Sequence, residues 1–109
     1  MEKSSFSITE QPEAQGVRFE AAGYIVYDTA GQFEKALSDA LQNDPESITI
    51  DMEKVLVFTS IGIRVILKIY KMAMEKGIGF HIENPSGIVR NVFKLSKLEE
   101  MLLNPSTEQ

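Results

Sequence analysis

The sequence predicts one α/β domain with a mixed sheet of four or five strands and about four helices, mainly on one face. Some segments alternate apolar and polar residues, which is typical of strands, and in others the apolar residues recur at helical spacing. The two kinds of segment follow one another along the chain. Strands separated by whole helices imply crossover connections and therefore parallel pairing in the middle of the sheet. A length of 109 residues suits one domain with one hydrophobic core.

The N-terminal part of the chain predicts strands followed by a helix. Apolar and polar residues alternate over 6–11 and again over 17–21, and a β-prone run follows over 24–27. Thr29 is predicted to cap a helix over roughly 30–42, because its hydroxyl could accept a hydrogen bond from the first helical turn. These segments are therefore expected to form a hairpin, or two adjoining strands, and the first helix.

The central part of the chain predicts the longest helix. A short strand is expected over 47–52, and a second apolar run over 55–58 leads into it. The apolar residues of 60–76 fall on one helical face, and Gly77 is a suitable residue to end the helix in a left-handed conformation.

The C-terminal part predicts one more strand and two short helices. The strand is expected over 79–83, and Ser86 is a plausible cap for a helix over 88–95. A fourth helix is predicted over roughly 97–103, and the tail 104–109 is expected to fray.

The composition excludes several classes of function. A net charge of −5 argues against nucleic-acid binding, which needs clustered Lys and Arg. Because the chain has no cysteine and one histidine, His81, neither a thiolate zinc site nor a multi-histidine metal site is expected. No phosphate-cradling glycine motif or catalytic constellation occurs, so no cofactor or enzyme activity is expected. Without a long apolar run or a signal peptide, the chain is expected in the cytoplasm, with no direct insertion into a membrane.

Ser60 carries the sharpest functional hypothesis. It follows Thr59 between an apolar strand and an apolar helix, where a hydroxyl can accept the unpaired N–H groups of the first turn. The same position favours a phosphate, because these N–H groups and the helix dipole attract negative charge. Ser60 is therefore either a helix cap or a phosphorylatable switch. Arg64, one turn further on, would either pair with a phosphate on Ser60 or be solvated.

A group of acids near the ends of one predicted strand is a candidate for a surface around the Ser60 turn: Asp44, Glu46, Asp51 and Glu53. Asp51 and Thr59 come at or near the ends of predicted parallel strands, and functional loops of open α/β sheets collect at that edge. These acids are either ordinary loop residues or part of an acidic surface that a partner recognises.

This arrangement of residues resembles the STAS domain, and within it the anti-sigma factor antagonists of bacteria. The family pattern has a strand ending in Asp, here Asp51, and then a short apolar run before Thr-Ser-Ile-Gly-Ile at 59–63 opens an apolar helix. Gly23 and the Phe-Glu-Lys-Ala-Leu segment at 33–37 match upstream, and residues 84–95 match downstream. The resemblance covers roughly residues 5–103.

The resemblance implies a regulatory role and no catalysis. In the family, the serine at the position of Ser60 is phosphorylated by the partner anti-sigma factor, a serine kinase, and a phosphatase resets it. The unphosphorylated form binds that partner and frees a sigma factor. Thr59 stands where many members have Asp and is a second possible acceptor, and Val26 replaces another frequent acid.

The expected partner surface comprises the residues around this turn. They are Asp28, Asp51, Thr59, Ser60, Ile61, Gly62, Ile63 and Arg64. The free protein is expected to be a monomer, by resemblance. Two alternatives remain open: an accessory subunit of a membrane lipid transport system that docks an ATPase subunit without phosphorylation, and a folded module in which Ser60 only caps its helix.

Overall fold

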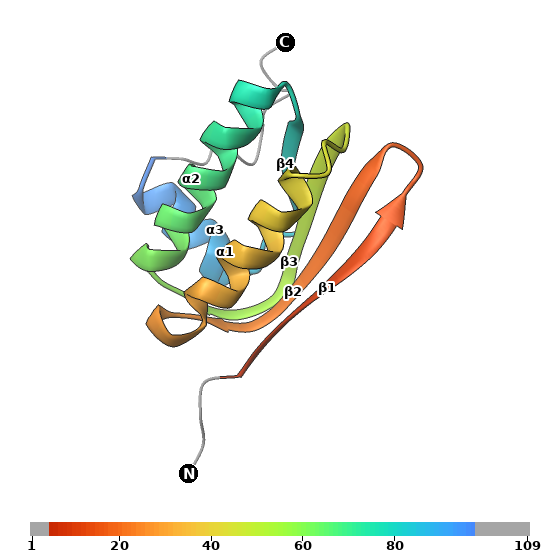
Figure 1. Cartoon of the computed structure of the whole chain (residues 1–109). Coiled ribbons are helices and arrows are strands. Elements are labelled where there is room, and N and C mark those ends of the chain that lie inside the picture. Colours follow the sequence, from red (N-terminus) through yellow and green to blue (C-terminus); the bar gives the residue numbers. More distant parts are fainter. Residues whose placement is uncertain (1–4, 98–109) are drawn as a thin grey trace.

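A computed structural model describes residues 5–97 as a sheet covered on one side by helices (Figure 1). Within these residues there are four strands and three helices. In chain order they are β1 (Phe6–Glu13), β2 (Gly16–Ile25), α1 (Tyr27–Leu41), β3 (Ser47–Phe58), α2 (Ser60–Lys76), β4 (Gly79–Glu83) and α3 (Gly87–Leu95). The predicted α/β class and mixed sheet are confirmed.

The sheet has the strand order β1-β2-β3-β4, so its spatial order follows the chain. β1 and β2 form an antiparallel hairpin, whereas β2, β3 and β4 run parallel. Parallel crossovers are right-handed almost without exception, and successive crossovers that advance in the same direction place their helices on the same face. This is why α1 and α2 lie on the same side of the sheet, and α3, which follows the last strand, lies on that side as well (Figure 1). The helices therefore lie mainly on one face, as predicted.

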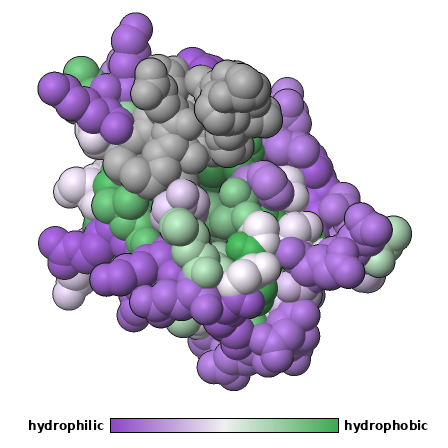
Figure 2. Space-filling view, turned by 90° about the horizontal axis from the view of Figure 1, so that it is seen from above, coloured by the Kyte–Doolittle hydropathy of each residue, from purple (hydrophilic) through white to green (hydrophobic). Residues whose placement is uncertain are grey.

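The core fills the space between the sheet and the helices. Phe19 and Ile50 of the sheet, Ile66 of α2 and Phe93 of α3 are at most 1% exposed. Figure 2, which views the domain from the end where α2 finishes, shows hydrophilic residues along most of the outline and a group of hydrophobic residues toward the middle. Burial of this apolar surface is the main term that favours folding.

The other face of the sheet is polar and is held by ion pairs across three strands. Arg18 of β2 contacts Asp51 of β3 at 3.0 Å and Glu83 of β4 at 2.7 Å. Burial raises the pKa of Asp51, but hydrogen bonds from the Glu53 backbone N–H, the Asn84 side chain and Arg18 outweigh burial and lower it below the usual value. Asp51 therefore stays charged and ties the middle of the sheet together.

The structure corrects two predicted strand boundaries. The segments 47–52 and 55–58 are one strand, β3, because register shifts against β2 accommodate the two exposed residues Glu53 and Lys54. β2 likewise continues through Gly23, whose φ of +98° is one that glycine adopts without strain. Interruptions of the alternating pattern are irregularities within strands here and do not end them.

The start of α1 was also predicted wrongly. The helix begins at Tyr27, which had been assigned to a β-prone run, and Thr29 lies within the first turn. The Thr29 hydroxyl accepts a hydrogen bond from the Val26 N–H at 3.0 Å and donates one to the Tyr24 carbonyl at 2.6 Å. Thr29 therefore does stabilise the start of the helix, but from the third helical position and not from the cap position.

The ends of the remaining helices agree with the predictions. Gly77 ends α2 with a φ of +73°, and the Ser86 hydroxyl caps α3 by accepting from the Val89 N–H at 3.3 Å. Apart from Lys97, the predicted fourth helix over 97–103 and the tail 104–109 lie outside the described residues. No helix within residues 5–97 is long and apolar enough to cross a bilayer.

Replacing Asp51 by Asn should lower the free energy of unfolding at pH 7 by about 1 kcal/mol, because the ion pair with Arg18 and the charge-assisted hydrogen bonds are lost. Since the folded pKa of Asp51 is lowered, its contribution is complete above the unfolded value near 3.9 and is lost as pH falls through the folded value. Urea unfolding of wild type and variant from pH 7 to pH 2.5 measures this. The difference between their free energies of unfolding should shrink as the pH falls.

Glu75→Gln is the control for that series, because Glu75 is exposed and makes no ion pair among residues 5–97. A constant gap between wild type and Asp51→Asn at every pH would show that the charge of Asp51 does not stabilise the sheet.

Candidate functional site

The site begins where β3 passes into α2. Thr59 is the residue before the helix and has an extended backbone, while Ser60 is the first helical residue. The Thr59 hydroxyl donates to the Ile25 carbonyl at 3.3 Å and makes no capping hydrogen bond. The Ser60 side chain is exposed and makes no hydrogen bond within residues 5–97. Of the two interpretations of Ser60, the helix cap is therefore wrong, because Thr59 occupies the cap position and Ser60 already belongs to the first turn.

The first turn of α2 is held against the sheet by the ring of Phe58. That ring packs edge-on against Phe93 with centroids 5.6 Å apart. A Cβ on Gly62 would lie 2.6 Å from the Phe58 ring and 3.0 Å from an Ile25 methyl group. Gly62 therefore allows the helix to approach the end of the sheet. The inward position of Gly62, and of Val65 one turn on, leaves Ser60 and Arg64 on the outer side of α2.

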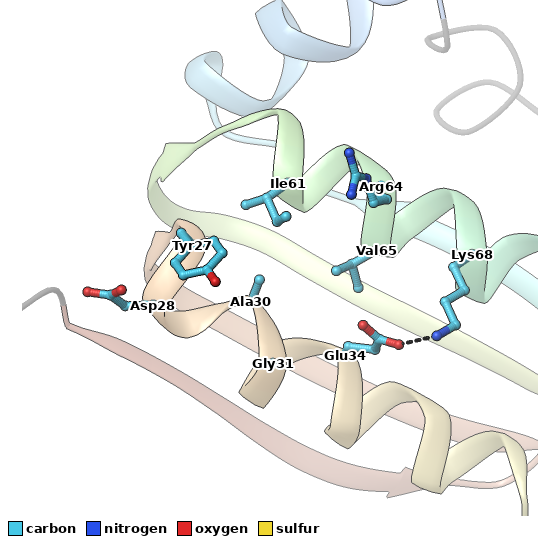
Figure 3. Close-up of a pocket in the computed structure, with 9 residues that line it drawn as sticks. All are labelled: Tyr27, Asp28, Ala30, Gly31, Glu34, Ile61, Arg64, Val65 and Lys68. Carbon is cyan, nitrogen blue, oxygen red and sulfur yellow. Dashed lines mark hydrogen bonds and ion pairs between the residues drawn. The ribbon is translucent and has the colours of Figure 1, made fainter.

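A groove of about 730 Å³ lies between α1 and α2 next to this turn (Figure 3). Both helices supply its walls, and the wall residues are mixed in polarity. They are Tyr27, Asp28, Ala30, Gly31 and Glu34 of α1, with Ile61, Arg64, Val65 and Lys68 of α2.

The charges of the groove are only partly neutralised. Lys68 and Glu34 form an ion pair across the two helices at 2.5 Å (Figure 3). Arg64 and Asp28, at the end of the groove where the helices begin, make no ion pair within the described part of the chain. The first turn of α2 carries no acidic residue, so its positive end is not offset by a carboxylate of its own helix.

Most residues of the predicted partner surface lie at one end of the domain. Residues 59–64 form the start of α2, and Asp28 lies in the first turn of α1, which follows the parallel neighbour β2. Asp51 is an exception. It lies in the middle of β3, seven residues before Phe58 and thus roughly 20 Å along the strand. Its placement in a loop near Ser60 was wrong, because β3 continues past it.

Tyr27 is a site residue that the sequence pattern did not indicate. Its side chain is 82% exposed although it is large and aromatic, and it lines the groove opposite Ile61 (Figure 3). Tyr27 precedes Asp28 and Thr29, and such a segment can also start a helix. The β-prone residues before it favoured a strand instead. Exposed aromatic side chains at a groove are typical of interaction surfaces.

The comparisons with known proteins define the class. The STAS domain family matches residues 5–109, so this chain belongs to the STAS domain family. No match was found among curated protein sequences.

Solved structures of anti-sigma factor antagonists share the fold. One from Mycobacterium paratuberculosis is 21% identical, with a TM-score of 0.76 over 90% of this chain and 83% of its own. The antagonist SpoIIAA in its unphosphorylated form is 19% identical, with a TM-score of 0.77 over 89% of this chain and 86% of its own. The Bacillus cell fate determinant SpoIIAA in the phosphorylated form is 19% identical, with a TM-score of 0.71 over 89% of each chain.

Replacing Gly62 by Ala should lower the free energy of unfolding by about 1–3 kcal/mol, because the added methyl group meets a ring that Phe93 already holds in place. The matched control is Gly31→Ala in α1, where a Cβ would have nothing within 4 Å. That variant should be more stable than wild type by about 0.5–1 kcal/mol, because alanine favours the helix. Chemical denaturation measures both, and equal effects of the two substitutions would contradict the packing argument.

Proposed function

We propose that this protein is an anti-sigma factor antagonist whose binding to a cognate anti-sigma factor is switched by phosphorylation of Ser60. The observation that carries the proposal is the state of Ser60, an exposed hydroxyl at the first position of α2 that makes no hydrogen bond to any other residue of 5–97. Its neighbour in the chain, Ile61, lines the groove between α1 and α2. The likeness in fold to an antagonist known in unphosphorylated and phosphorylated forms supports this proposal.

A phosphate on Ser60 is compatible with the fold. It would lie in solvent beside N–H groups of a helical turn that carries no acid, so helix α2 need not unfold to receive it. The modification adds up to two negative charges and three acceptor oxygens. At a surface where a partner packs closely, this change acts on binding and leaves the core intact.

The local structure favours Ser60 over Thr59 as the acceptor. The Thr59 hydroxyl is partly buried and is bonded to the Ile25 carbonyl, whereas the Ser60 hydroxyl is exposed. A kinase must place the attacking oxygen in line with the phosphate of its nucleotide. Thr59 would have to give up a hydrogen bond and turn away from the sheet, and Ser60 would not.

The partner surface of this proposal is the start of α2 together with the groove. Tyr27 and Ile61 offer apolar area, and Asp28 and Arg64 offer charges that a partner can pair. In this scheme the partner is a serine kinase that binds the unmodified protein, a serine phosphatase restores that form, and the free antagonist is a cytoplasmic monomer.

Ser60→Ala should abolish phosphorylation by the kinase partner, because the accepting oxygen is gone, and Thr59→Ala should still be phosphorylated. Transfer of labelled phosphate, followed by mass spectrometry of the modified peptide, measures both. Label that persists on Ser60→Ala and is lost on Thr59→Ala would assign the acceptor to Thr59.

Ser60→Asp should retain the fold and weaken partner binding at least about tenfold, since a carboxylate brings negative charge to the contact surface. Calorimetric titration with the partner captured from the native extract measures the affinity. Gln11→Glu on β1 is a control that adds the same charge at an exposed position away from the groove. Equal affinities for Ser60→Asp and wild type, or capture of a transporter ATPase subunit, would favour the accessory-subunit alternative.

A further inference from the structure

We propose that Arg64 is the intramolecular partner of the Ser60 phosphate, so that phosphorylation withdraws a cation from the groove as well as adding an anion. The inference rests on the proposed function, because it concerns the phosphorylated form of Ser60. Arg64 is then the residue through which the modification changes the partner surface.

The spacing of the two residues suits a contact within one helix. Ser60 and Arg64 are four residues apart in α2, and side chains at this spacing lie one above the other on the same face. Long side chains of a helix turn back toward its N-terminus, so Arg64 leans over the turn that contains Ser60. Both side chains are exposed, so a phosphate on Ser60 meets no packed atoms on that side.

Arg64 is also available for this contact. Two cations line the α2 wall of the groove, and Lys68 is held by Glu34 of α1. Figure 3 shows Arg64 between Ile61 and Lys68, with a contact drawn only for Lys68. Arg64 has no hydrogen bond or ion pair within residues 5–97, so pairing with a phosphate breaks no existing interaction there.

The guanidinium group of Arg64 is well suited to bind a phosphate. Its planar donors match two phosphate oxygens at once, and it remains charged at every physiological pH. In the unmodified protein the same group lies in the groove wall, where a carboxylate of a partner could pair with it. After phosphorylation the guanidinium group is paired with the phosphate. The partner then encounters a changed charge at two positions, Ser60 and Arg64, one helical turn apart.

The test uses the full chain with phosphoserine incorporated at position 60 during translation, so it needs no kinase or partner. Phosphorus NMR follows the second ionisation of the phosphate, which lies ordinarily near pH 6. A nearby cation favours the dianion, so wild type should titrate at a lower pH than Arg64→Ala. The expected difference between the two midpoints is about 0.2 to 0.7 pH units, and it should shrink at high salt.

Two further variants make the result specific. Lys71→Ala removes the same charge about 16 Å along the helix from Ser60 and should titrate as wild type does. Arg64→Lys should recover part of the difference, because it restores the charge without the planar pair of donors. The Arg64 Nε–H resonance of wild type should move with the phosphate titration.

Coincident midpoints for wild type and Arg64→Ala, with an Arg64 resonance insensitive to pH, would overturn the inference. An equal rise in Lys71→Ala would also overturn it, since the effect would then be net charge alone. Failure of the proposed function is a separate result: a kinase that never modifies Ser60 leaves these titrations unchanged.

Discussion

The packing of Phe58 on the first turn of α2 is the contact on which the rest of the site depends. Phe58 is the last residue of β3, and its ring packs against Phe93 in the core. Because Gly62 has no side chain, helix α2 can approach the Phe58 ring closely. Because Gly62 and Val65 face inward, helical geometry places Ser60 and Arg64 on the outside. The packing of this ring against Gly62 therefore helps to set the side of α2 on which Ser60 reaches solvent.

The two faces of the domain use charge in different ways. On the open face of the sheet, Arg18 is occupied by Asp51 and Glu83, and these contacts connect three strands. On the helical side, Lys68 and Glu34 pair across the groove, while Arg64 and Asp28 stay unpaired in the described part of the chain. Charges that are already paired stabilise a structure, and unpaired charges in the wall of a groove are available to a partner or a modification.

The order and type of the elements could be predicted because apolar periodicity is a local property of the chain. The bounds predicted for α2 and β4, residues 60–76 and 79–83, agree with the structure. The errors arose where tertiary contacts outweighed local preference. Glu53 and Lys54 looked like the end of a strand, yet pairing with β2 carries β3 through them. Thr29 looked like a cap, yet its hydroxyl serves the Val26 N–H from inside the helix.

The sequence by itself determined the fold class, the position of the β3–α2 turn and the presence of two adjacent hydroxyls, since patterning and residue type suffice for these. Only the tertiary structure decided what the hydroxyls do. The Thr59 hydroxyl is bonded to Ile25, a residue 34 positions away in the chain. Tertiary packing also placed Asp51 among the ion pairs of the sheet and created the groove beside Ser60 from two separate helices. Such contacts join residues distant in the chain, and no local pattern encodes them.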